Sequence, residues 1–84
     1  MSYREVVLQK LKEVVAEFHG VPVAIINEET LIGERATYIS MALVSRVGAS
    51  PYLYPSDTVG VVLRKILHEG EREVGLGGGE LAQA

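Results

Sequence analysis

Few residues of this chain combine a reactive side chain with surroundings that suit chemistry. Ser40 lies among large apolar residues in the stretch YISMALV. Its hydroxyl could bear a covalently attached group, or Ser40 could be a small residue that packs between elements. No histidine or acid has a spacing that would bring it to Ser40, so a Ser-His-Asp triad is not indicated. We therefore expect no catalytic residues and no enzyme activity.

The remaining candidates for chemistry are two histidines, an acidic pair and a glycine run. His19 and His68 are expected at the ends of two helices, without cysteine and without a His-x-x-x-His spacing, so the sequence predicts no metal site. Glu28 and Glu29 are adjacent acids in an expected loop, where water would solvate them. The run GLGGG at 75–79 lacks the Lys-Ser/Thr of a phosphate-binding loop and is typical of a linker.

Composition limits the classes of protein that fit. The chain has 84 residues, of which 48% are hydrophobic and 23% charged, enough to form the core of one domain. It has no cysteine, which excludes disulfides and thiolate metal sites. The net charge of −3 disfavours a dedicated nucleic-acid binder. No apolar run reaches the roughly 20 residues that span a bilayer, and MSYREVV lacks a signal-peptide core, so we expect a cytoplasmic protein.

The clearest predicted element is a helix over residues 2–19. Its apolar residues recur at helical spacing on one face, with Leu8 and Val15 beside them; the stripe consists of Val7, Leu11, Val14 and Phe18. Ser2 followed by Glu5 fits a capping box, and Gly20 suits the C-terminal stop. This segment should form one wall of the core.

The middle of the chain permits two interpretations. Residues 20–34 form either a β-hairpin or a long ordered loop that buries its apolar residues; those residues are Val21, Ile25, Ile26, Leu31 and Ile32. Residues 36–47 fit a helix with Ile39 and Leu43 on one stripe, and they also alternate as a strand would. Twelve residues is long for a strand in so small a domain, which favours the helix.

A last helix is predicted over 57–69. Ser56 or Asp57 would cap it, Gly70 would end it, and its inward residues would be Val59, Leu63, Ile66 and Leu67. We expect a single compact domain at 1–70 and a flexible glycine-rich tail at 71–84. The predicted fold is mainly α, a small helical bundle with a long ordered loop after its first helix. The alternative is an α+β fold with a hairpin at about 21–39 between two helices.

Several phrases of the sequence, in order, resemble the acyl and peptidyl carrier proteins. LKEVVAEFHGVPVAII is similar to the first helix of that family and its exit, and ETLIGE to its long first loop. ISMALVS aligns with the modified serine and the helix that follows, and DTVGVVLRKI with the closing helix. The resemblance covers residues 7–67. It implies a small acidic helical protein that docks on partner enzymes.

The carrier resemblance implies that Ser40 bears 4'-phosphopantetheine, on whose thiol an acyl cargo would travel. Ile39 replaces the acid that precedes the serine in the family, and the chain from Ser40 to Thr58 is several residues shorter than usual. Residues 36–47 also contain Arg46 and no acid, whereas the second helix of a carrier offers acids to basic partners. A degenerate or truncated carrier is the expectation.

A weaker resemblance links VAEFHGVPVAII and TVGVVLRKI to the DNA-binding domain of bacterial replication initiators. The helix-turn-helix that reads DNA in that family is replaced here by VGASPYLYPS, which is too short and too rich in proline. Basic residues could still form a modest surface; they are Arg35, Arg46, Arg64 and Lys65. Eleven acids outnumber eight bases, which disfavours nucleic-acid binding.

The sequence therefore leaves three functions in order of preference. The first is a carrier-like module that docks on partner enzymes and would bear an acyl cargo at Ser40. The second is a small structural or interaction protein without catalytic activity, which would form a homodimer. The third is a weak nucleic-acid-binding domain.

Overall fold

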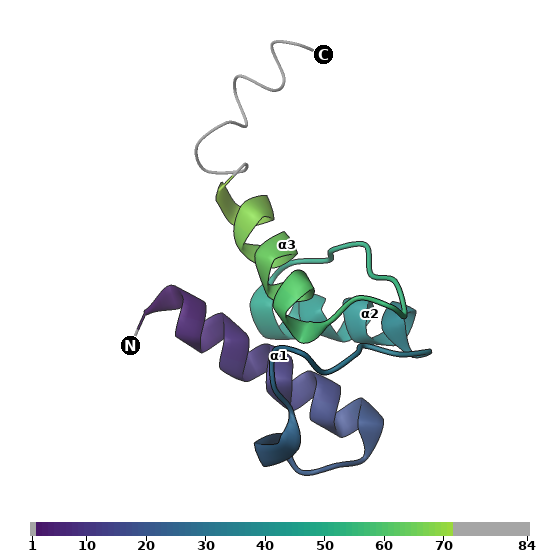
Figure 1. Ribbon diagram of the computed structural model, residues 1–84. Helices are drawn as coiled ribbons and strands as arrows, with labels where there is room; N and C mark the ends of the chain where they lie inside the picture. The colour runs from purple at the N-terminus through teal and green to yellow at the C-terminus, as the bar shows by residue number, and fades with distance from the viewer. Residues whose placement is uncertain (1, 72–84) are drawn as a thin grey trace.

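The computed structural model describes residues 2–71, which form three α-helices and one 3-10 turn (Figure 1). In chain order these are α1 (Tyr3–His19), η1 (Val23–Ile25), α2 (Ala36–Val47) and α3 (Val59–Glu71). The prediction of a mainly helical domain with a long ordered loop is confirmed. The alternative hairpin at 21–39 does not form, because the only β pairing within the described residues is an isolated bridge between Leu31 and Thr58. Residues 72–84, which hold most of the predicted tail, lie outside the described residues.

Helix α1 is capped at both ends as its sequence predicts. The backbone N–H of Glu5 donates to Oγ of Ser2 at 3.2 Å, and the backbone N–H of Ser2 donates to Oε1 of Glu5 at 3.2 Å. Together these bonds form the capping box. Gly20 adopts the left-handed conformation at φ 68°, and its N–H donates to carbonyls of the last turn. Three of the four predicted stripe residues, Val7, Leu11 and Val14, are buried.

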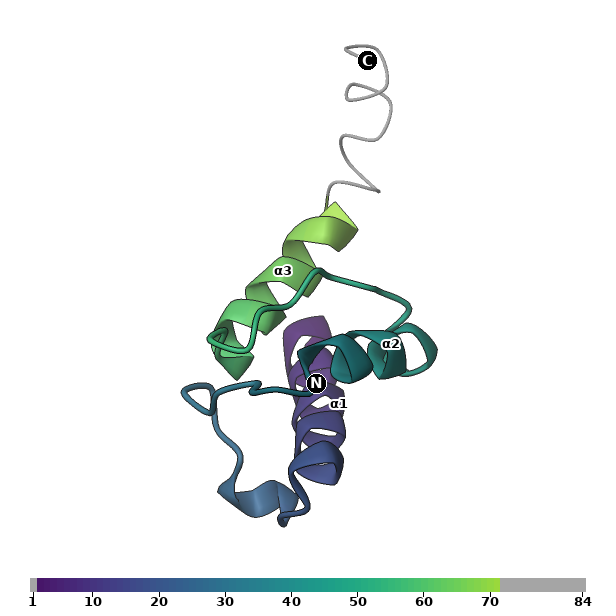
Figure 2. The same cartoon turned by 90° about the vertical axis from the view of Figure 1, so that its right-hand side faces the viewer.

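Helices α2 and α3 both pack on α1. Within residues 2–71, the Cα atoms of α2 and α3 stay more than 8 Å apart. The segment from residue 49 to residue 57, here called the strap, runs between them (Figures 1 and 2). Pro51 and Leu53 of the strap are buried. The strap therefore connects α2 to α3 and contributes two buried residues to the interior.

The loop after α1 is joined to the start of α3 by backbone hydrogen bonds. Near the bridge between Leu31 and Thr58, the N–H of Ile32 donates to the carbonyl of Asp57 at 2.8 Å, and that of Val59 to Thr30 at 2.9 Å. Successive side chains of an extended segment point to opposite sides. Ile32 is therefore buried, whereas Leu31 is 55% exposed.

The prediction of a fully buried loop was therefore wrong at two positions. Leu31 faces outward for the reason given above, and Ile25 is 61% exposed because η1 buries none of its residues. Ile26 and Ile32 are buried as predicted, and Val21 packs against the core while partly exposed. The buried side chains of Ile26 and Ile32 are enough to hold this loop, because its backbone is also hydrogen-bonded to the start of α3.

The boundaries of α3 also differ from the prediction. The hydroxyl of Thr58, rather than Ser56 or Asp57, accepts the hydrogen bond from the N–H of Val61 at 3.3 Å in the first turn. The helix continues through Gly70 to Glu71. Glycine in a helix costs about 1 kcal/mol relative to alanine, which weakens a helix without ending it.

We predict that Leu11→Ala destabilises the domain by about 2–5 kcal/mol, because Leu11 is fully buried in α1 and the shorter side chain leaves a cavity. Leu31→Ala removes the same atoms from an exposed position and should change stability by less than about 1 kcal/mol. Chemical denaturation monitored by circular dichroism measures both. Equal stabilities for the two variants would show that the α1 stripe does not form the core.

Candidate functional site

The position of α2 is set by the loop that precedes it. Gly33 has φ 83°, a left-handed conformation that favours glycine, and its N–H donates to the carbonyl of Pro55 at 3.0 Å. The chain then turns, and the N–H of Ala36 donates to the carbonyl of Gly33 at 3.2 Å as α2 begins. At the other end Gly48, at φ 73°, ends the helix, and its N–H donates to the carbonyl of Val44. Both ends of α2 are thus fixed by local backbone geometry.

Helix α2 presents two apolar faces. One is in the core and carries Ala36, Ile39 and Leu43, which are all buried. The other is exposed; beside the polar Thr37 and Ser45 it carries Tyr38, Met41 and Val44, which are 60%, 64% and 51% exposed. Residues three apart are neighbours on a helix surface, so these three side chains form one stripe. We call Tyr38, Met41 and Val44 the α2 face.

The exposed sides of the other helices differ from the α2 face. On α1 the exposed side is mainly charged or polar, and it includes Arg4, Glu5, Gln9, Lys10, Glu13 and Glu17. Its one large exposed hydrophobic residue, Tyr3, begins the helix. On α3 the exposed residues with described side chains are Arg64 and His68. Among the exposed sides of the three α-helices, the α2 face is thus the most apolar, and the other large exposed hydrophobic residues of the described chain lie outside these helices apart from Tyr3: Val23, Ile25, Leu31, Tyr52 and Tyr54.

The residue expected to carry a cofactor, Ser40, lies in the second turn of α2 rather than at its start. It is half-buried, and its Oγ donates to the carbonyl oxygen of Pro51 at 2.6 Å. Ile39, which stands where carriers have an acid, is fully buried in the core. An acid at that position would be buried without a partner, which is costly. The hydrogen bond from Ser40 to Pro51 thus connects α2 to the strap.

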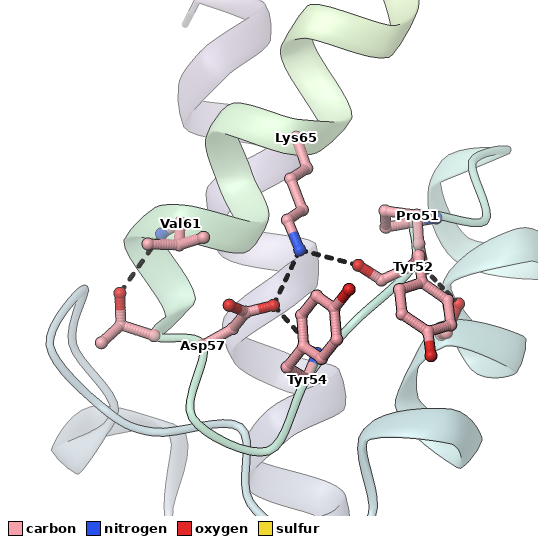
Figure 3. Close-up of polar contacts among 8 residues, drawn as sticks. Pro51, Tyr52, Tyr54, Asp57, Val61 and Lys65 are labelled. Carbon is pink, nitrogen blue, oxygen red and sulfur yellow. Dashed lines mark hydrogen bonds and ion pairs between the residues drawn. The ribbon is translucent and has the colours of Figure 1, made fainter.

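On its other side the strap is bound to α3 by Lys65 (Figure 3). Nζ of Lys65 donates to the carbonyl oxygen of Tyr52 at 2.7 Å and to Oδ2 of Asp57 at 2.8 Å. The same Oδ2 accepts from the N–H of Tyr54 at 2.9 Å. Nζ also lies 5.1 Å from the centre of the Tyr54 ring, which packs edge-on against Tyr52 with centroids 4.9 Å apart.

Side chains hold the strap to the two helices, and its backbone also accepts hydrogen bonds from the loop, at Pro55 from Gly33 and at Asp57 from Ile32. Ser40 fixes it to α2, and Lys65 with Asp57 fixes it to α3. The hydrogen bond from Lys65, followed by that from the N–H of Tyr54, lowers the pKa of Asp57 below its usual 3.8. Both donors stabilise the charged carboxylate.

The other residues singled out in the sequence are separated in space. Nε2 of His19 donates to the carbonyl oxygen of Leu31 at 2.9 Å, while His68 is exposed on α3. Glu28 is paired with Arg4 at 3.1 Å rather than simply solvated. Across residues 2–71, no three histidine, cysteine, aspartate or glutamate side chains lie close enough together to hold a metal ion. The run GLGGG lies outside the described residues.

Two of the four basic residues considered for nucleic acid are in ion pairs. Arg46 lies 3.2 Å from Glu17, and Lys65 is the partner of Asp57. Arg35 precedes α2 and Arg64 lies on α3, both exposed. The acids beside two of these cations reduce the positive potential that a phosphate backbone would meet.

None of the described helices is long and apolar enough to cross a membrane. Comparisons with protein-family models, curated proteins and solved structures found no match to this chain. The feature of the described residues that bears on function is the α2 face, on a helix that the core and the strap hold in place.

Sequence reasoning missed the α2 face although a signal was present. The prediction of a helix at 36–47 rests on Ile39 and Leu43 as its buried stripe. On the opposite side Tyr38, Met41 and Val44 recur every three residues, which on a helix indicates a second apolar face. The roles of Lys65 and Pro51 had no comparable signal, because each depends on a contact between distant parts of the chain.

We predict that Asp57 contributes to stability in a pH-dependent way. Because its folded-state pKa is lowered, its contribution is present above the usual aspartate pKa of 3.8 and is lost as the pH falls through the lower folded-state value. Asp57→Asn should be less stable than the native protein at pH 7 and should lose less further stability on acidification. Urea denaturation between pH 7 and pH 2 measures this difference.

Glu29→Gln, which neutralises an exposed acid, is the control for the Asp57 experiment. Its stability should follow the native pH profile closely. If Asp57→Asn follows the native profile as well, the ion pair with Lys65 does not hold the strap.

Proposed function

We propose that this protein is a non-catalytic docking module whose contact surface is the α2 face. The observation that carries the proposal is the exposure of Tyr38, Met41 and Val44 on one side of a helix whose other side is fully packed. Tyrosine and methionine are enriched at the centres of protein interfaces, and charged residues are depleted there. The α2 face has this composition.

The rigidity of α2 supports the docking role. Ile39 and Leu43 are fully buried beneath the α2 face, so the backbone of the helix is held by the core. A partner would not need to order it, which lowers the entropic cost of binding. The side chain of Met41, by contrast, has several rotatable bonds and can adapt to the shape of a partner.

The charges around the α2 face indicate the kind of partner. Helix α2 contains no acidic residue; Arg35, at its start, is exposed beside the exposed Glu34, and Arg46, in its last turn, is paired with Glu17. A complementary surface would have an apolar centre and a rim of mixed charge near Glu34 and Arg35. This partner differs from the basic enzymes that the carrier resemblance implies, because those enzymes read acids on the second helix.

The docking role does not require a cofactor, and we propose a structural role for Ser40. If Ser40 instead carried phosphopantetheine, its hydroxyl would first have to give up the hydrogen bond to Pro51. Docking on a partner, which the carrier resemblance implies, is thus retained. Ser40 holds the strap by its hydrogen bond to Pro51 and carries no acyl cargo.

We predict that the native protein, co-expressed with a broad-specificity phosphopantetheinyl transferase, retains its unmodified mass, because the Ser40 hydroxyl is half-buried and bonded. Intact-protein mass spectrometry measures this. A mass increase of one phosphopantetheine arm that disappears in Ser40→Ala would contradict the structural role of Ser40 and establish the carrier function.

We predict that making the α2 face polar weakens docking without unfolding the domain. The variant is Met41→Lys with Val44→Lys, and the control is Gln9→Lys with Glu13→Lys on the exposed side of α1. A protein that co-purifies with the native chain would be identified, purified and titrated against all three forms. The α2 variant should weaken binding by at least about tenfold, equal to about 1.4 kcal/mol, because central interface residues carry most of the energy.

Two further measurements make the docking experiment decisive. Circular dichroism should show equal helicity for the native protein and both variants. Sedimentation equilibrium of the native protein tests the alternative that a second copy covers the α2 face, since a dimer that the α2 variant dissolves would identify that occupant. Unchanged partner affinity in the α2 variant would place the docking surface elsewhere.

A further inference from the structure

We infer that Met41 is a site of reversible oxidation that converts the α2 face from apolar to polar. The consequence for docking rests on the proposed function, whereas the chemistry at Met41 does not. Oxidation of Met41 would thus regulate docking at the α2 face.

Three observations single out Met41. The residue is 64% exposed, so an oxidant in solution can approach its side chain. It is the middle residue of the α2 face, with Tyr38 and Val44 on either side along the helix. The chain contains no cysteine, so no thiol of this protein competes for the oxidant. Met1 is the only other methionine and lies outside the described residues.

The oxidant that suits this site is a peroxide. A lone pair of the Met41 sulfur attacks one oxygen of hydrogen peroxide, the O–O bond breaks, and an S–O bond forms. The second oxygen leaves as water after proton transfer. The sulfur loses two electrons, and the product is methionine sulfoxide. A methionine sulfoxide reductase restores the thioether with two thiols, which yield a disulfide and water.

The position of Met41 makes the change local. The sulfoxide adds a polar oxygen to an exposed side chain, while the core side of α2 holds Ile39 and Leu43 and is not touched. The fold should therefore persist. A partner that covers the α2 face would have to bury the sulfoxide oxygen without a prepared donor, which is unfavourable.

The chemistry is tested by peroxide treatment of the intact protein followed by tryptic digestion. Cleavage after Arg35 and Arg46 places Met41 in the peptide 36–46, whereas Met1 falls in a separate peptide. We expect that peptide to gain one oxygen at a rate within about threefold of a free methionine derivative, with unchanged helicity and melting temperature. A rate more than about tenfold slower, or loss of the fold on oxidation, would overturn the inference.

The regulatory consequence is tested with two substitutions and the partner identified by co-purification. Met41→Leu should resist oxidation and retain binding after peroxide treatment, and Met41→Gln, which resembles the sulfoxide in polarity, should weaken binding by at least about tenfold. Full affinity of the oxidised native protein would overturn the regulation while leaving docking intact. Full affinity of the Met41→Lys, Val44→Lys variant would instead overturn the docking surface, whatever the rate of oxidation.

Discussion

Backbone hydrogen bonds between the loop after α1 and the start of α3 determine the arrangement of the whole domain. Glu28 and Thr30 accept from Gly60 and Val59, so loop carbonyls satisfy N–H groups that the first turn of α3 leaves without partners. Two residues further on, Ile32 donates to the chain that leads into α3. The close crossing requires a small residue in the helix. A Cβ atom on Gly60 would lie 3.2 Å from the carbonyl oxygen of Glu28.

The α2 face follows from this crossing. Once Ile32 is fixed in the core, Gly33 turns the chain and α2 begins at Ala36 with Ile39 and Leu43 directed inward. The strap then connects α2 to α3, and Ser40 and Lys65 hold it by its carbonyl groups. The outer side of α2 thus remains uncovered by any element of the described chain. The docking proposal depends on this uncovered apolar surface.

The parts of this structure that depend on local pattern were predictable from sequence. The capping box of Ser2 and Glu5, the Gly20 stop and the bounds of α2 all follow from residues a few positions apart. Gly60 is a glycine within a helix, where glycine is costly, and the Glu28 carbonyl is the close neighbour that its missing side chain admits. What escaped prediction depends on distant contacts. Leu31 is exposed because it pairs with Thr58, and Ser40 is an anchor because Pro51 passes beside it.

The most direct test of the crossing is the unfolding free energy of Gly60→Ala. Helix propensity alone predicts a gain of up to about 1 kcal/mol from this substitution. In this structure the added methyl group would press on the Glu28 carbonyl, which the hydrogen bond from the Gly60 N–H holds at 2.8 Å. The variant should therefore be less stable than the native protein, and the amides of Ile32 and Val59 should exchange faster with solvent. A gain of about 1 kcal/mol with unchanged exchange would show that the loop is not held against α3.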